Sequence, residues 1–251
     1  MLPELELGPI TLQTFGICFA LGFLASGALV TRRLKELGKP PDWAYEAVFS
    51  AMVGGLVGSR IDYLIQNYDE VSDDLLGSLF SGSGLVWFGG VLGGALGVAL
   101  WARWRGFLEL RMADMAVPAL ALGYAIGRVG CQLSGDGDYG RATDLPWGMA
   151  YPEGTVKTTE EVHPTPVFET VAMGLVALVL WNLRDRYRPG VLLAIYLVLA
   201  GIERLLIELI RRNDAVLAGL TPAQLFSVAM IAGGAALFTR LRGGSGQPRP
   251  A

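Results

Sequence analysis

Seven long apolar runs are the feature that most constrains how this chain folds. Each run holds 18 to 24 residues, which is enough for a helix to cross a hydrocarbon core of about 30 Å. Hydrophobic residues make up 52% of the 251 residues and charged residues only 17%, a composition typical of membrane proteins. The runs lie at 10–31, 43–66, 84–104, 112–131, 166–183, 190–210 and 221–240. We therefore expect an all-α polytopic membrane protein with seven transmembrane helices. A count of six, or a re-entrant segment, is the alternative.

The positions of Lys and Arg predict how these helices are oriented. Thirteen of the twenty cations follow the first, third, fifth and seventh runs, and the positive-inside rule makes that side cytoplasmic. We therefore expect the N-terminus outside, the C-terminus in the cytoplasm, and outer-face loops at 67–83 and 132–165. Segment 1–242 is expected to be a single integral-membrane domain, and 243–251 a flexible cytoplasmic tail. Because Glu4 and Glu6 but no cation precede the first run, that run is interpreted as a retained helix rather than a cleavable signal.

Composition also argues against several classes of function. The net charge of −3 reflects charges sorted by membrane side, and the chain has no basic patch typical of nucleic-acid binding. Its cysteines are Cys18 and Cys131, and its one histidine is His163. Two cysteines and one histidine provide neither a disulfide framework nor a set of ligands for a transition metal. We expect no metal and no cofactor.

Residues 123–148 carry the strongest sign of chemistry. Here an apolar run leads into Arg128 and then into a polar, Gly-rich, acidic loop. A charge at bilayer depth costs roughly 2.5–3.5 kcal/mol or more, so it is rarely without a function. His163 follows this stretch, and Glu169 lies where the next apolar run begins. Polar groups therefore gather at one membrane face.

Three arginines near the outer ends of three runs form a candidate anion site. Arg60, Arg128 and Arg204 are expected at similar depth beneath the outer surface, where the phosphate of an outer-leaflet phospholipid lies. The planar guanidinium donates two parallel hydrogen bonds to a phosphate or carboxylate and stays charged. Glu208 lies four residues after Arg204 and shares its helix face. The alternative is that the arginines reach to the interface or form structural ion pairs.

The chain resembles the prolipoprotein diacylglyceryl transferases, a family of seven-helix membrane enzymes. The resemblance covers nearly the whole sequence, and its strength lies in the order and spacing of many short motifs. These are Leu7-Gly8-Pro9-Ile10, Thr31-Arg32-Arg33, Gly58-Ser59-Arg60-Ile61-Asp62-Tyr63, Phe88-Gly89-Gly90, Gly127-Arg128-Val129-Gly130, Tyr139-Gly140-Arg141, Thr143-Asp144-Leu145-Pro146-Trp147-Gly148, His163-Pro164-Thr165 with Glu169, Arg204 with Glu208, and Gly219-Leu220-Thr221 with Gln224.

The resemblance implies a reaction, its partners and a set of site residues. The expected reaction moves diacylglycerol from phosphatidylglycerol to the lipobox cysteine of a prolipoprotein signal peptide, at the outer leaflet of the bacterial cytoplasmic membrane. Arg128 and Arg204 would hold the headgroup phosphate, with Glu208 orienting Arg204. The implied catalytic residues are Arg128, Arg204, Glu208, His163 and Asp138. The implied substrate-binding residues are Arg60, Tyr63, Gly127, Gly130, Asp136, Gly140, Arg141 and Glu169.

This chain departs from the family pattern at several of these places. Phe88 stands where the family usually has a histidine that is a proposed base for the thiol. Phe15 replaces a tyrosine, and Cys131 replaces an asparagine of the signature. The loop after Arg128 is one residue longer than usual, so either Asp136 or Asp138 is the acid of the signature. A thiol near pKa 8.5 is already slightly ionised at neutral pH, so the loss of this histidine does not by itself abolish catalysis. His163 or Asp138 is a candidate substitute base.

Two other functions fit the residues less well. One is a relative that binds anionic phospholipid or lipoprotein precursors without transfer, which the change at Phe88 motivates. The other is a transporter that uses intramembrane charges. Against a transporter, the charges lie toward the outer surface rather than the midplane, and the helices contain no apparent internal repeat.

Overall fold

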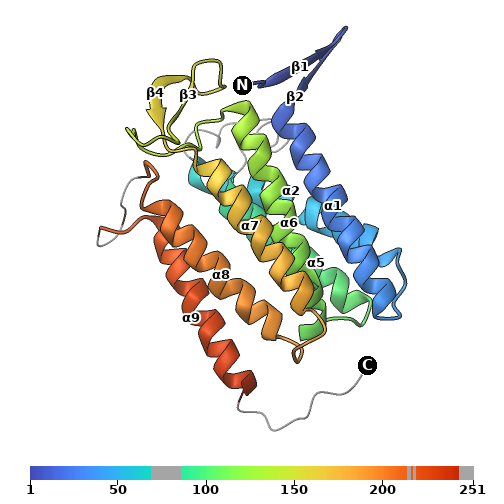
Figure 1. Cartoon of the computed structure of the whole chain (residues 1–251). Coiled ribbons are helices and arrows are strands. Elements are labelled where there is room, and N and C mark those ends of the chain that lie inside the picture. The colour runs from blue at the N-terminus through green and yellow to red at the C-terminus, as the bar shows by residue number, and fades with distance from the viewer. Residues whose placement is uncertain (69–85, 214–215, 217–218, 243–251) are drawn as a thin grey trace. The chain divides into compact units, whose positions relative to one another are not determined.

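The computed structural model of the chain describes residues 1–68, 86–213, 216 and 219–242, and most of these are helical (Figure 1). The α-helices are α1 (Thr14–Glu36), α2 (Trp43–Gln66), α5 (Trp87–Trp104), α6 (Leu110–Ser134), α7 (Thr165–Leu183), α8 (Val191–Glu208) and α9 (Pro222–Arg242). Two short antiparallel hairpins pair β1 (Glu4–Leu7) with β2 (Ile10–Gln13), and β3 (Met149–Tyr151) with β4 (Thr158–Val162).

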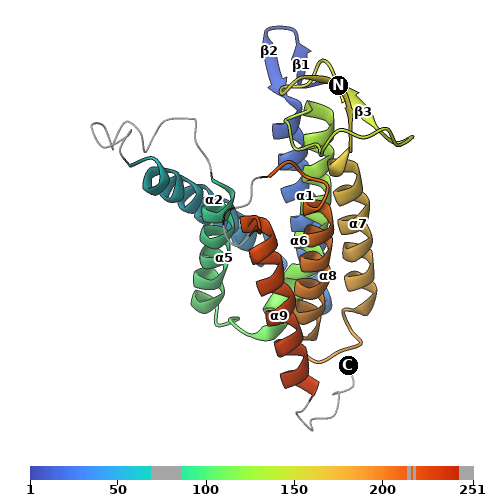
Figure 2. The same cartoon turned by 90° about the vertical axis from the view of Figure 1, so that its left-hand side faces the viewer.

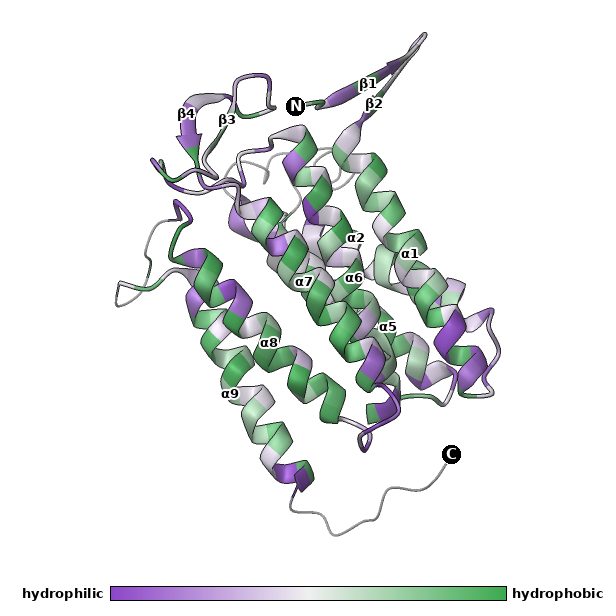
Figure 3. Ribbon diagram, in the orientation of Figure 1, coloured by the Kyte–Doolittle hydropathy of each residue, from purple (hydrophilic) through white to green (hydrophobic). Residues whose placement is uncertain are grey.

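Five helices of the described part are long and apolar enough to cross a membrane, namely α1, α2, α6, α7 and α9. Apolar residues run along these helices and hydrophilic residues gather toward their ends (Figure 3). Helices α5 and α8 have 18 residues each, and α8 carries Glu203, Arg204 and Glu208 near its C-terminal end. The coarser prediction, a mostly helical protein with several apolar helices of membrane length, is confirmed.

The two hairpins are additions to the predicted all-α pattern. At the first predicted helix, residues 10–13 form strand β2, and the helix starts at Thr14. The turn between β1 and β2 contains Gly8 with φ 65°, a conformation that glycine adopts readily. In the predicted outer loop 132–165, the second hairpin buries the last residue of each strand, Tyr151 of β3 and Val162 of β4. Most of the predicted loop 67–83 and the tail 243–251 lie outside the described residues.

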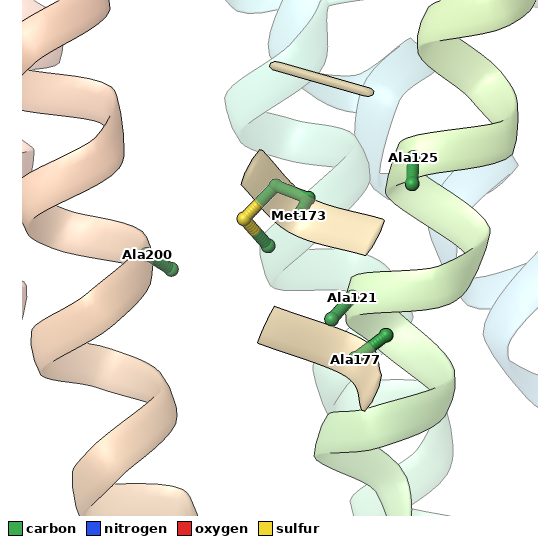
Figure 4. Packing of buried hydrophobic residues seen from close by; sticks show 5 residues of the cluster. All are labelled: Ala121, Ala125, Met173, Ala177 and Ala200. Atoms are coloured by element: carbon green, nitrogen blue, oxygen red, sulfur yellow. The ribbon is translucent and has the colours of Figure 1, made fainter. Parts of the chain in front are cut away.

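The chain divides into two compact units, Met1–Leu29 with Ala113–Ala251, and Val30–Met112. In the larger unit, small side chains let α6, α7 and α8 pack closely around Met173 (Figure 4). Helices α8 and α9 lie side by side in both views (Figure 1 and Figure 2). A Cβ added to Gly234 would lie only 2.8 Å from the carbonyl oxygen of Ala194, so this helix pair needs a glycine there.

One carboxylate ties the beginning of α6 to the beginning of α8. The backbone N–H of Gly190 donates to Asp114 Oδ2 at 2.6 Å, and that of Leu193 donates to Asp114 Oδ1 at 2.8 Å. The first N–H groups of a helix lack partners within it and carry partial positive charge, so a carboxylate stabilises them. Asp114 thereby fixes where α8 starts relative to α6.

In the smaller unit, α2 and α5 cross at glycines (Figure 2). A Cβ on Gly58 would lie 2.7 Å from Gly93 Cα, and a Cβ on Gly93 would lie 2.8 Å from Gly58 Cα. The two backbones therefore touch directly, as small residues allow in membrane helices. Near one end of the pair, Glu46 of α2 accepts hydrogen bonds from Trp101 and Arg105.

Candidate active site

A cluster of arginines and carboxylates lies at one end of the larger unit. There α6 ends, α7 begins and α8 ends, so side chains from distant parts of the sequence meet. The hydroxyl of buried Thr165, the first residue of α7, donates to the carbonyl oxygen of Asp138 and fastens the loop after α6 to α7. The cluster consists of Arg128 from α6, Asp138 from that loop, Glu169 from α7, Arg204 and Glu208 from α8, and Arg211 just beyond α8.

Glu169 is the centre of this cluster. Its side chain is 0% exposed, and its Oε2 lies 3.2 Å from Arg128 Nε and 3.1 Å from Arg211 NH2. Its Oε1 lies 3.4 Å from Arg204 NH1 and accepts a hydrogen bond from the Tyr124 hydroxyl at 2.8 Å. A buried carboxylate is tolerated only when its oxygens are satisfied in this way. One acid therefore holds three arginines together.

Asp138 is the accessible acid of the cluster. Its carboxylate bridges Arg128 and Arg211, with Oδ1 lying 3.1 Å from Arg211 NH1. Burial opposes its ionisation, but the charges of Arg128 and Arg211 hold the pKa of Asp138 below its usual value. Its side chain is 38% exposed, whereas those of Glu169 and Glu208 are 0% exposed.

Asp136 is placed differently from Asp138, because its carboxylate contacts the loop backbone. Its Oδ1 accepts the backbone N–H of Asp138 at 3.2 Å, and burial raises the pKa of Asp136. Of the two acids that the sequence left open, it is Asp138 that contacts the arginines. Ligand atoms of Cys131, Asp136 and Asp138 lie within 4.8 Å of one another. Because the Arg128 guanidinium pairs with Asp138 at this point, a cation there would meet a like charge.

Within the cluster, Arg204 is fixed from two sides. Its NH2 donates to Glu208 Oε2 at 2.6 Å, while NH1 faces Glu169. The predicted orientation of Arg204 by Glu208 matches this geometry. Three arginines face the three carboxylates of Asp138, Glu169 and Glu208, so their formal charges cancel. Of these three carboxylates, only that of Asp138 is accessible from outside the cluster.

The predicted glycines lie close to the cluster but serve different purposes. A Cβ on Gly130 would lie 2.8 Å from Cys18 Cβ, so this glycine lets α6 approach α1. Gly140 donates its N–H to the carbonyl oxygen of His163 at 2.8 Å, and a Cβ there would lie 2.6 Å from the carbonyl oxygen of Ile210. Apart from its chain neighbours and the nearby backbone of α6, no described atom lies within 4 Å of a Cβ added to Gly127.

His163 and Arg141 flank the cluster. His163 Nδ1 accepts a hydrogen bond from Trp147 Nε1 at 3.3 Å, so this ring nitrogen is already engaged. Arg141 Nε donates to the carbonyl oxygen of Arg211 at 3.0 Å. Arg141 therefore holds the segment that carries Arg211, while its exposed side chain stays at the surface.

Arg60 and Tyr63 belong to the smaller unit. Arg60 is buried, and its guanidinium carbon lies 5.0 Å from the centre of the Tyr63 ring. The structure thus brings these two predicted residues to each other. The side chain of Phe88, the second residue of α5, lies outside the described part of the chain.

Sequence reasoning did not include Arg211 or Tyr124 among the site residues. Arg211 is buried and contacts both Asp138 and Glu169. The sequence did offer a sign of Arg211, because it lies three residues after Glu208, less than one helical turn further along. Tyr124 lies one turn before Arg128 on α6, and the Arg128 guanidinium lies 4.9 Å from its ring centre. The same spacing rule identifies it.

Fold and site together define an integral membrane protein that gathers arginines and carboxylates at one end of its helices. The profile of the prolipoprotein diacylglyceryl transferases matches residues 4–240. The chain belongs to this family.

Several relatives support the assignment. The chain is 30% identical to the phosphatidylglycerol–prolipoprotein diacylglyceryl transferase of Clostridium tetani, over 82% of this chain and 83% of that protein. It is 30% identical to the enzyme of the same name from Chromohalobacter salexigens, over 93% and 89%. The corresponding enzyme of Photobacterium profundum is 32% identical over 93% of this chain and 90% of its own length.

Proposed function

We propose that this protein transfers the diacylglyceryl group of phosphatidylglycerol to the lipobox cysteine thiol of prolipoprotein signal peptides. Membership of the family supports this reaction, and the relatives carry its substrates in their names. The observation that carries the proposal is the Glu169 cluster, in which one fully buried carboxylate holds three arginines at one end of the helices. Such a site stabilises a departing phosphate.

We propose the following topology for this reaction. Residues 1–242 form a single domain with seven membrane-spanning helices in the bacterial cytoplasmic membrane. The N-terminus and the Glu169 cluster face outward, and the tail 243–251 is cytoplasmic. Support comes from the apolar helices of membrane length and from the cations that follow alternate runs.

Lipid binding starts with an exchange of anions. The phosphate of phosphatidylglycerol displaces the carboxylate of Asp138 from Arg128 and Arg211, the two arginines it bridges. Glu169 stays buried and keeps the arginines in place. The exchange conserves charge-assisted hydrogen bonds, because a phosphate oxygen accepts them from guanidinium groups as a carboxylate does.

The displaced carboxylate then becomes available for proton transfer. Away from the arginines, the pKa of Asp138 is no longer held low, so the carboxylate accepts the thiol proton more readily. The thiolate sulfur bonds to the terminal glyceryl carbon, and the bond from that carbon to the phosphate oxygen breaks. Glycerol phosphate leaves with the electron pair, and Arg128 and Arg204 stabilise its charge. Asp138 suits the role of base better than His163, whose Nδ1 already accepts from Trp147.

The test is transfer of labelled diacylglycerol from phosphatidylglycerol to a lipobox peptide by the purified protein in detergent. We expect Arg128→Ala to lose roughly 100-fold or more in kcat, as when a donor to a developing anion is removed. Arg128→Lys keeps the charge without the planar fork and should be intermediate. The matched control is Arg212→Ala. This arginine is exposed and lies outside the cluster, and its guanidinium carbon lies 4.5 Å from the centre of the Tyr139 ring.

Three outcomes contradict the proposal. Full activity of a folded Arg128→Ala variant rules out its role at the phosphate. A parent protein that binds phosphatidylglycerol but forms no product is instead a lipid-binding relative. Movement of a solute across sealed vesicles without transfer would indicate a transporter.

A further inference from the structure

The start of α9 makes an unusual double use of one hydroxyl group. Thr221 immediately precedes α9 and is only 7% exposed. The N–H of Gln224 donates to Thr221 Oγ1 at 3.2 Å, and the N–H of Thr221 donates to Gln224 Oε1 at 3.0 Å. This reciprocal pair is a capping box, which satisfies two backbone donors at a helix N-terminus. Capping uses the hydroxyl oxygen only as an acceptor.

The proton of the same hydroxyl is directed to Glu208. Thr221 Oγ1 donates to Glu208 Oε1 at 2.7 Å. A hydroxyl has one proton to donate, and here it goes to a buried carboxylate rather than to solvent. The side chain of Asn213 donates to the same Oε1, also at 2.7 Å.

Glu208 passes this constraint to Arg204. It is the last residue of α8, where the helix itself provides least support. Its Oε2 accepts from Arg204 NH2 at 2.6 Å, so both of its oxygens are engaged. The Arg204 guanidinium is thus held between Glu208, which Thr221 fixes, and Glu169, which α7 supplies.

We propose that Thr221 is a positioning residue for transfer: its hydroxyl holds Glu208, and Glu208 aims Arg204 at the phosphate. This inference rests on the proposed function. Thr221 touches neither substrate nor a reacting atom in this scheme. Its effect is on how well Arg204 is prepared for the charge that develops as glycerol phosphate leaves.

Three variants of the full-length protein separate positioning from helix capping. Thr221→Val removes the hydroxyl and both of its contacts, while Thr221→Ser keeps them. Gln224→Ala removes the reciprocal cap but leaves the bond from Thr221 to Glu208. We expect Thr221→Val to lower kcat by roughly 10- to 100-fold, the effect of one hydrogen bond to a charged group. The kcat of Thr221→Ser and of Gln224→Ala should stay within about twofold of the parent's, because both variants keep the hydrogen bond from residue 221 to Glu208.

The melting temperature of each variant in detergent is the folding control. If Thr221→Val and Gln224→Ala lose activity equally, or if Thr221→Val loses none, Thr221 only caps α9 and the inference is wrong. A double-mutant cycle adds a second criterion, because a residue that acts through Glu208 should show no further loss in kcat when Glu208→Gln is already present. Additive losses contradict positioning through Glu208.

A binding measurement keeps this inference separate from the proposed function. If the parent protein forms no product, binding of phosphatidylglycerol to the purified protein in micelles replaces kcat as the readout. Weaker binding by Thr221→Val, with Thr221→Ser and Gln224→Ala unchanged, supports the positioning of Arg204 while the transferase proposal fails. Unchanged binding by all three variants overturns the inference as well.

Discussion

Among the described residues, two of the clusters that combine arginine and glutamate near helix ends are built in opposite ways. In the larger unit, Glu169 is 0% exposed and is shared by three arginines. In the smaller unit, Glu46 forms an ion pair with one arginine of the described residues, Arg105, and each side chain is 31% exposed. Tryptophan surrounds this second pair, with the Arg105 guanidinium lying 4.4 Å from the ring centre of Trp104.

The difference separates two uses of an ion pair in a membrane protein. Where water and headgroups reach the charges, a one-to-one pair beside tryptophan anchors a helix end at the interface. Where the carboxylate is enclosed, it imposes a fixed geometry on several cations at once, and its loss leaves them in mutual repulsion. In the proposed function, the enclosed cluster is the one that binds the phosphate.

Replacement of the enclosed carboxylate should have the largest effect. Glu169→Gln leaves three arginines without their shared anion, and breaking a buried ion pair from one side costs about 3–5 kcal/mol of unfolding free energy. We expect a markedly lower melting temperature and no detectable transfer. Denaturation in detergent and the transfer assay measure the two effects. A variant with the parent's stability would mean that Glu169 is not the anchor of the cluster.

Replacement of the accessible carboxylate, Asp138, should lower both KM for phosphatidylglycerol and kcat. Asp138→Asn removes both the anion that competes with phosphate and the base, so KM for phosphatidylglycerol should fall while kcat drops roughly 100-fold. Steady-state kinetics with varied phosphatidylglycerol in mixed micelles gives both values. A raised KM would contradict the exchange of anions at Arg128 and Arg211.

The difference in stability between the parent and Asp138→Asn should depend on pH. Burial works against ionised Asp138, but Arg128 and Arg211 hold its pKa below the ordinary value, which is about 3.9. The stabilisation is therefore complete at neutral pH and is lost as the pH falls through the lowered pKa. The difference in melting temperature between the parent and Asp138→Asn should be constant above pH ~5 and disappear in acid.

The partly exposed pair of Glu46 and Arg105 should matter least. Glu46→Gln removes one acid whose side chain is partly solvated, and the freed Arg105 keeps its contacts with tryptophan rings. We expect transfer activity within about twofold of the parent, since no charge is left buried without a partner. A loss as large as that of Glu169→Gln would abolish the distinction between the two clusters.

The helices were largely predictable from the sequence, because length and apolarity decide which segments suit a membrane. Their ends were less so: the first apolar run ends at residue 31, yet α1 continues to Glu36 through its basic last turn. The hairpins were missed because their strands are only three to five residues long. In the second hairpin, glycines beside and between the strands also interrupt any clear alternation of apolar and polar residues.

The arginines and acids of the site were predictable as a group, but their pairing was not. Arg211 meets partners 42 and 73 residues away in the chain, a distance that no local pattern encodes. The choice between Asp136 and Asp138 depends on Gly135 and Gly137, whose φ angles of 58° and 94° set the path of the loop. Such conformations are open to glycine but are not dictated by it.

The contact between Asp114 and the start of α8 limits which insertions this chain can accommodate. Arg128 lies 14 residues beyond Asp114, and Arg204 lies 14 residues beyond Gly190. At a rise of about 1.5 Å per residue, the backbone of each arginine lies about 21 Å along its helix from the contact between Asp114 and Gly190. A single insertion in either segment would shift one arginine by about 1.5 Å and rotate it by about 100°. The two segments can therefore lengthen or shorten only in step.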